Sequence, residues 1–357
     1  MKSRRRQIFL AVSVPLMALG LLAVFLYARG RFAVVNRGAA GAPATSSVAA
    51  TPTTTSPFTG LPCPNAKSRP LAVMLSEDDA ARPLSGITKA DLVVEMPVVT
   101  GLVNRLMVVY QCESPAEIGS VRSARHDFIP IAAALDSIYA HWGGSHFALE
   151  QLNQHVIDNI DALPNPADAF FRKKNIREPH NGFTSSERLL RASRTLGYRT
   201  ELRDNVGYPH ASAGSAQAAG TTTAEAVGQP GDLTIGYPNS FEVRFHYDPQ
   251  SKQYLRFRDG RAERDKLDAS QVAVATVVVM RAVSYQIEGE YNTVKIEGEG
   301  QAAFYLNGQE IRGRWQKDRA TRESPLKFFD SQGREVLFQP GKIWIAVIEP
   351  DRPVTWR

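Results

Sequence analysis

The segment Leu92–Tyr110, LVVEMPVVTGLVNRLMVVY, contains two short apolar runs, at Leu92–Val94 and at Leu106–Tyr110. A third run, LAVML, occupies Leu71–Leu75. Runs of this length are typical of buried β-strands. The following chain alternates between helix and strand patterns, and the predicted elements are helix Phe128–Leu135, strand Ser137–His141, helix Phe147–Asn159 and helix Ser185–Leu196. This alternation predicts a layered α/β or α+β domain over residues 58–210.

The pattern changes after Pro230, where short strand-like runs replace the helices. Asn307-Gly308, between Leu306 and Glu310, is the dipeptide that a type I′ hairpin requires. The predicted strands are Phe241–Tyr247, Gln253–Phe257, Val272–Met280, Val294–Glu297, Ala302–Leu306, Leu326–Phe329, Glu335–Phe338 and Ile343–Ile348. We therefore predict an all-β domain, a sandwich or a small barrel, over residues 232–357. A linker or long loop at 211–231 joins it to the first domain.

An uncharged, strongly apolar stretch of 21 residues, Ile8–Ala28, lies near the N-terminus. As a helix it is long enough to cross the roughly 30 Å hydrocarbon core of a bilayer. A cleaved signal peptide is the alternative, but its apolar core normally has only about 7–15 residues. We predict a cytoplasmic basic tail at 1–7, a transmembrane helix at 8–28 and a flexible linker at 29–57. The body then lies outside the cell membrane as part of a single-pass protein.

The charge distribution argues against a nucleic-acid binder. The whole chain has a formal net charge of +6, but seven Lys and Arg residues and no acidic residue precede Gly38. From Gly38 onward there are 35 basic and 36 acidic residues. The predicted body is therefore close to neutral, and its overall charge gives no support to binding of a phosphate backbone.

The chain has two cysteines, Cys63 and Cys112, and both follow the predicted anchor. An oxidising compartment permits a disulfide between them, and two unrelated buried thiols are the alternative. Neither cysteine belongs to a CxxC motif, which argues against thiol redox chemistry and a zinc ribbon.

Several long motifs resemble the bacterial YerB family. They are TGLP (Thr59–Pro62), RPLAVML (Arg69–Leu75), ARPLSGITKADLVVE (Ala81–Glu95), IGSVRSAR (Ile118–Arg125), IYAHWGGS (Ile138–Ser145), REPHNGFTSSERL (Arg177–Leu189), GEGQAAFYLNGQEIRGRW (Gly298–Trp315) and PGKIWIAV (Pro340–Val347). The resemblance implies an extracytoplasmic, membrane-attached protein with two domains of uncharacterised function. Many members resemble lipoproteins with a cysteine after the signal, whereas here no cysteine precedes Cys63. The family's His-Ala-Gly-Gly is His141-Trp142-Gly143-Gly144 in this chain.

Arginines near predicted strand ends form the first candidate site. Arg122, Ser123 and Arg125 lie between a predicted strand and the Phe128 helix, and Arg105 precedes the Leu106 strand. Guanidinium groups bind carboxylates and phosphates with paired hydrogen bonds, so these residues predict an anion site. The alternative is a structural network in which the arginines pair with Asp127, Glu95 and Asp91.

Two further segments carry candidate ligand-binding residues. The first is a strand-to-helix turn with paired glycines, and the second is a polar loop. The residues are His141, Gly143, Gly144 and Ser145 in the turn, and Arg172, Arg177, His180 and Asn181 in the loop. Both segments also fit ordinary structural turns. The catalytic candidates are His141, His180 and Glu95, and whether the protein is an enzyme stays open. No HExxH spacing is present, and we predict neither a metal nor a cofactor.

These features predict a membrane-anchored protein that binds an anionic cell-envelope ligand, either a wall glycan or a lipid-linked precursor. One alternative is an envelope phosphotransferase or hydrolase that uses the same pocket. The order of arginine, strand and helix has a faint likeness to the LytR–CpsA–Psr phosphotransferases, but this is fold-level analogy. The other alternative is a protein–protein scaffold that acts through the β domain. The sequence identifies no protein partner.

Overall fold

The computed structural model describes residues 54–211, 231–238 and 241–357. The predicted basic tail at 1–7, the membrane helix at 8–28 and most of the linkers at 29–57 and 211–231 lie outside these residues. None of the helices in the described part is long and apolar enough to cross a bilayer. All described residues belong to one compact unit, Thr51–Arg357.

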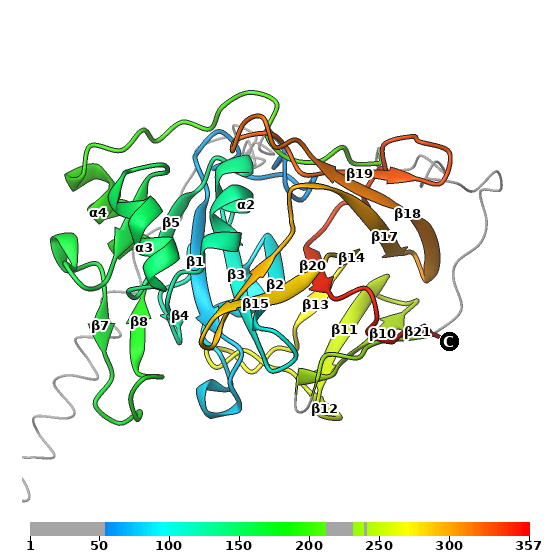
Figure 1. Cartoon of the computed structure of the whole chain (residues 1–357), viewed down its shortest axis with the longest axis horizontal. Helices are drawn as coiled ribbons and strands as arrows, with labels where there is room; N and C mark the ends of the chain where they lie inside the picture. Colours follow the sequence, from blue (N-terminus) through cyan, green and yellow to red (C-terminus); the bar gives the residue numbers. More distant parts are fainter. Residues whose placement is uncertain (1–53, 212–230, 239–240) are drawn as a thin grey trace, which may run out of the picture. The chain divides into compact units, whose positions relative to one another are not determined.

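A ten-stranded mixed sheet passes through both halves of the chain, in the order β19-β18-β17-β14-β20-β2-β3-β1-β5-β6. Its strands are β1 (Leu71–Ser76), β2 (Leu92–Val99), β3 (Val103–Tyr110), β5 (Ile138–His141), β6 (Asn159–Asp161), β14 (Thr276–Arg281), β17 (Gly298–Leu306), β18 (Gln309–Lys317), β19 (Lys327–Asp330) and β20 (Ile343–Ile348). Strand β20 pairs in parallel with both β2 and β14, and Figure 1 labels these three strands close together in the centre of the body. The N-terminal half is therefore mixed α/β, and strands of the mostly-β C-terminal half extend its sheet.

The remaining strands of the described residues form three smaller sheets. A six-stranded sheet, in which β13 pairs with β11, has the order β12-β11-β10-β9-β21. The others are β15-β16 and β4-β8-β7. The strands are β4 (Ile118–Gly119), β7 (Phe171–Arg172), β8 (Gly182–Thr184), β9 (Gly231–Ile235), β10 (Val243–Asp248), β11 (Gln253–Arg258), β12 (Arg261–Ala262), β13 (Ala273–Val274), β15 (Ser284–Glu288), β16 (Tyr291–Val294) and β21 (Val354–Trp356).

Both faces of the large sheet are buried, which explains the uniformly apolar strands. On β1, Val73 and Leu75 belong to a core shared with the six-stranded sheet, where Phe245 packs against Trp344. Met74 belongs to a second core on the opposite face, which includes residues of helices α2 (Ile129–Ala134) and α3 (His146–Asn153). Figure 1 shows α2 beside β1 and β3. The sheet is thus the central layer of the described body.

Most of the helices and turns lie where the sequence pattern predicted them. Helix α4 (Ser186–Thr195) begins at Ser185, whose hydroxyl accepts a hydrogen bond from the N–H of Arg188. Asn307 and Gly308 both have positive φ and join β17 to β18, which confirms the hairpin. The remaining helices are the 3₁₀ segments η1 (Asp79–Ala81), η2 (Ile87–Lys89), η3 (His126–Phe128) and η4 (Pro166–Asp168).

Three local predictions were wrong. Of the predicted strand Val294–Glu297, only Val294 lies in a strand, as the last residue of β16, and the next strand begins at Gly298. The helix predicted to reach Asn159 ends at Asn153, because the chain turns through His155 in a left-handed conformation and Asn159 then begins β6. The predicted strand Glu335–Phe338 forms only isolated bridges from its two ends. Apolar spacing alone did not reveal these breaks.

A disulfide joins Cys63 to Cys112, with their Cα atoms 5.3 Å apart. It fastens the segment that enters the body to the end of β3. The N–H groups of Gln111 and Cys112 both donate to the Asp91 carboxylate, so the backbone beside the disulfide is also fixed.

Candidate functional site

Arg105, Arg122 and Arg125, here called the arginine cluster, lie at the carboxyl end of the parallel strands β1 and β5. Arg105 on β3 pairs in the strand register with Ser76, the last residue of β1. The segment that contains Arg122 crosses this end, and the Arg122 N–H donates to Met74 O at 2.9 Å. Ligands commonly bind at the carboxyl ends of strands in α/β sheets.

The three guanidinium groups are close enough to affect one another. Burial, followed by the positive charges of Arg125 and Arg122, lowers the pKa of Arg105 to about 9. Arg105 also donates from Nη1 to Ser123 O at 3.0 Å, which supports the loop between the other two arginines. The structure therefore brings together the three arginines that the sequence placed at separate strand ends.

One carboxylate, Asp78, serves the arginine cluster. Arg122 Nη2 lies 3.6 Å from Asp78 Oδ2, and His180 Nδ1 lies 3.9 Å from the same oxygen. In the described part of the chain, no ion pair joins Arg105 or Arg125 to an acidic residue. The Nε atoms of all three arginines are buried without a hydrogen-bond partner in that part. The cluster thus keeps an excess of positive charge and unused donors.

The alternative pairing of these arginines with Asp127, Glu95 and Asp91 is not what the structure shows. Asp91 accepts backbone N–H groups, and Asp127 accepts the Thr293 hydroxyl. Glu95 instead lies in a buried network, where Trp344 Nε1 donates to its carboxylate at 3.0 Å. Burial raises the pKa of Glu95, and its side chain is fully enclosed. Its position favours a structural role over direct contact with a ligand.

The side chains of the turn after β5 make contacts within the fold that hold the turn in place. His141 is fully buried, and its ring nitrogens contact Gly143 O at 2.8 Å and Asn159 Oδ1 at 3.2 Å. Burial lowers the pKa of His141. Gly143 has a φ of +59°, and the Ser145 hydroxyl caps α3 by accepting from the Ala148 N–H. Gly144 approaches Ala124 closely, and a Cβ there would lie 3.2 Å from the alanine side chain.

The predicted polar loop divides into two parts. Arg172 donates to Asn181 Oδ1 at 2.6 Å, and its guanidinium lies over the Trp142 ring at 4.3 Å. Arg177 is exposed. His180 alone reaches the arginine cluster, through their shared neighbour Asp78, and burial lowers its pKa. The role of Asp78 was not predicted from the sequence, although its position just after the apolar β1 run is a usable signal.

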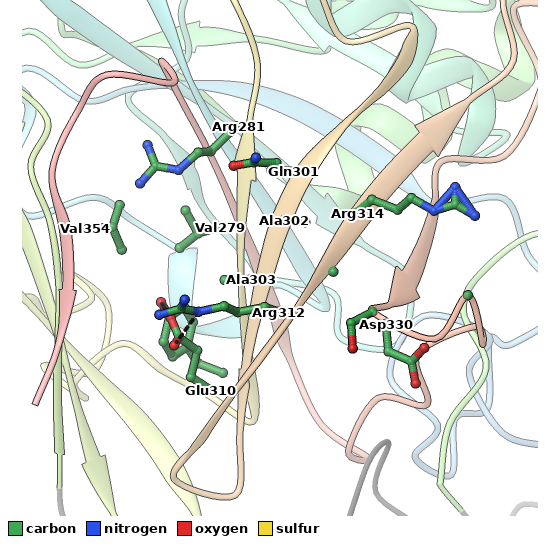
Figure 2. Close-up of a pocket in the computed structure, with 14 residues that line it drawn as sticks. Val279, Arg281, Gln301, Ala302, Ala303, Glu310, Arg312, Arg314, Asp330 and Val354 are labelled. Carbon is green, nitrogen blue, oxygen red and sulfur yellow. Dashed lines mark hydrogen bonds and ion pairs between the residues drawn. The ribbon is translucent and has the colours of Figure 1, made fainter.

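A hollow with a volume of about 770 Å³ lies elsewhere, on the face of β14, β17 and β18. Strand register places Gln301 beside Arg314 and Ala303 beside Arg312. Figure 2 shows the side chains of Arg312 and Arg314 over these strands, with Val354 on one side and Asp330 on the other. Arg312 pairs with Glu310 at 3.1 Å. The arginine cluster does not line this hollow.

Two family models match the chain. Residues 58–199 match "Protein of unknown function (DUF3048) N-terminal domain", and residues 233–345 match the corresponding C-terminal domain. The protein named "Putative lipoprotein YerB" of Bacillus subtilis (strain 168) is 28% identical over 301 residues, which are 83% of this chain and 86% of YerB. The crystal structure of YerB from Bacillus subtilis superposes with a TM-score of 0.74 at 25% identity, covering 85% of this chain and 99% of that one. The chain is therefore a YerB homologue that carries both domains of the DUF3048 family.

Proposed function

We propose that this protein is a membrane-attached, extracytoplasmic binding protein that holds an anionic cell-envelope ligand at the arginine cluster. The ligand class is a wall glycan or a lipid-linked precursor that carries phosphate or carboxylate groups. The observation that carries the proposal is that only one of the three guanidinium groups, that of Arg122, pairs with a carboxylate, Asp78, in the described part of the chain. Arg122 and Arg125 are partly exposed, so an anion has access to them.

Three observations support the location outside the cytoplasm. The stretch at 8–28 has the length and composition of a membrane anchor. The Cys63–Cys112 disulfide suits an oxidising compartment. The name of the Bacillus subtilis relative also describes a lipoprotein, which is a membrane-attached class.

The arginine cluster supports a binding function better than it supports catalysis. An enzyme needs a base or nucleophile close to the bound anion. His141 and Glu95 are enclosed, so His180 is the remaining candidate among the three predicted catalytic residues. Protein contact through the β region has one observation in its favour, because β15 and its preceding residue expose Val283, Tyr285 and Ile287.

Replacing Arg122 and Arg125 with alanine should weaken binding of fractionated anionic envelope polymer by at least about tenfold, since charge-assisted hydrogen bonds contribute roughly 1.5–3 kcal/mol each. The full-length variant and wild type would be compared by pull-down at two salt concentrations. Stability should change little, because no ion pair joins Arg125 to an acidic residue in the described ranges and the Arg122–Asp78 contact is partly exposed.

The matched control is Arg312→Ala with Arg314→Ala, which removes the same charge from a different surface. This control should keep wild-type binding. An equal loss in both double variants would mean that binding follows net charge alone, and a large loss of stability in the first would mean that Arg122 and Arg125 are structural. The scaffold alternative would be favoured if the pull-down retained a protein and not the polymer, and if the Ile287→Asp variant no longer retained that protein.

A further inference from the structure

A second hollow, separate from the arginine cluster, lies between the helical layer and the C-terminal strands. Its volume is about 680 Å³. The elements that form it are η3 and α2, α3, the end of β16 with the residues that follow, and the turn after β18. Its lining includes His126, Asp127, Gln151, Thr293, Lys295, Glu297, Arg319 and Arg322.

Three polar side chains meet at the wall of this hollow. Thr293 Oγ1 donates to Asp127 Oδ1 at 3.0 Å, and His126 Nε2 lies 3.2 Å from each of these oxygens. The other ring nitrogen of His126, Nδ1, is buried and has no partner among the described residues. This arrangement joins residues that are more than 160 positions apart in the chain, so it forms only when the two halves pack.

The lining of the hollow also contains three cationic residues. Lys295, Arg319 and Arg322 line it, and no ion pair in the described ranges joins any of them to an acidic residue. Arg319 donates from Nε to the backbone oxygen of Glu297 at 3.2 Å, and its terminal nitrogens donate no hydrogen bond within the described ranges. Lys295 and Arg319 are exposed. These three cations therefore line the same hollow as the hydrogen-bonded His126–Asp127–Thr293 group, and Glu297 is the other acidic residue of the lining.

We propose that this hollow is a second binding site, for a phosphate monoester whose phosphate contacts Arg319, Arg322 and Lys295 and whose remaining polar groups contact His126 and Asp127. Arginine and lysine are the usual phosphate ligands in proteins. The neighbouring hydroxyl, carboxyl and imidazole groups suit the hydroxyl groups of a sugar or polyol phosphate.

Proton uptake should accompany binding. Burial raises the pKa of Asp127 to about 7, although hydrogen bonds from Val294 N–H and Thr293 act in the opposite direction. A bound phosphate adds negative charge nearby and raises this pKa further. The charged or titratable groups that also face the site are His126, Arg125, Tyr139, Lys295, Glu297, Arg319 and Arg322. Asp127 must be neutral for the tightest binding, so affinity should fall as the pH rises from 7 to 8.5.

The test is calorimetric titration of the full-length chain with glycerol 3-phosphate at pH 7.5, in two buffers that differ in ionisation enthalpy. We expect saturable binding with net proton uptake. Arg319→Ala with Arg322→Ala should weaken binding at least tenfold, and these residues lie at the rim, so folding is preserved. Asp127→Asn should keep binding but lose the proton uptake and the weakening between pH 7 and 8.5.

The Arg122→Ala variant separates this site from the proposed function. It should keep the proton-coupled binding of glycerol 3-phosphate that Arg319→Ala with Arg322→Ala loses. A loss of phosphate binding in Arg122→Ala but not in the Arg319/Arg322 double variant would overturn the second site and leave the arginine cluster as the anion site. Absence of saturable binding, or binding without proton uptake in wild type, would also overturn it.

Discussion

Replacing Arg256 with alanine should lower the free energy of unfolding by about 3–5 kcal/mol, the cost of removing one partner from a buried charge network. Arg256 lies on β11 and is fully buried. Its Nη2 donates to Glu77 Oε1 at 2.9 Å and to Glu95 Oε2 at 3.0 Å, and its Nη1 pairs with Glu263. The substitution leaves these three carboxylates buried without their common cation.

The loss of unfolding free energy in the Arg256→Ala variant should also depend on pH. Burial raises the pKa of Glu95 even with Arg256 present, and loss of the arginine raises it further. A carboxyl group whose pKa is higher in the folded state than in the unfolded state destabilises the fold as the pH rises through that range. The variant should therefore lose more stability at pH 8 than at pH 5.

Urea unfolding of the full-length protein at several pH values measures both effects. Arg312→Ala is the matched control, because Arg312 is 83% exposed and pairs only with Glu310 in the described part of the chain. This control should lie within about 0.5 kcal/mol of wild type. An Arg256→Ala deficit below about 1 kcal/mol would contradict a structural role for the network.

The sequence predicted local elements better than their assembly. The apolar runs corresponding to β1, β3 and β20 form strands, because a strand buried on both faces needs a continuous apolar run. The insertion of β20 between β2 and β14 was not predicted. That pairing depends on contacts about 250 residues apart in the chain, and local periodicity carries no information about them.

The same distinction holds for the functional residues. Arg105, Arg122 and Arg125 could be placed near one another because strand ends of one sheet meet at an edge. The fully buried Arg256 could not be recognised, because an arginine in an alternating strand is usually directed toward water. It points inward here because Glu95 on β2 and Glu77, which directly follows β1, compensate its charge. The His126–Asp127–Thr293 group was missed for the same reason, since its threonine comes from the other half of the chain.

Removing the disulfide should cost about 4 kcal/mol of unfolding free energy, the second large effect. Cys63 and Cys112 are 49 residues apart, and closing a loop of that length restricts the unfolded chain by roughly this amount. Cys63 is fully buried, so alanine is the suitable replacement at both positions. Guanidinium unfolding of Cys63→Ala/Cys112→Ala would measure the change.

Two comparisons separate loop closure from side-chain packing in this prediction. Wild type unfolded with a reductant present should approach the stability of the double variant, because reduction removes the cross-link and keeps both side chains. The single variant Cys112→Ala should lose nearly as much as the double variant, since the cross-link needs both sulfur atoms. If reduced wild type keeps the stability of the oxidised protein, the Asp91 hydrogen bonds to Gln111 and Cys112 already fix this segment, and the disulfide adds little to folding.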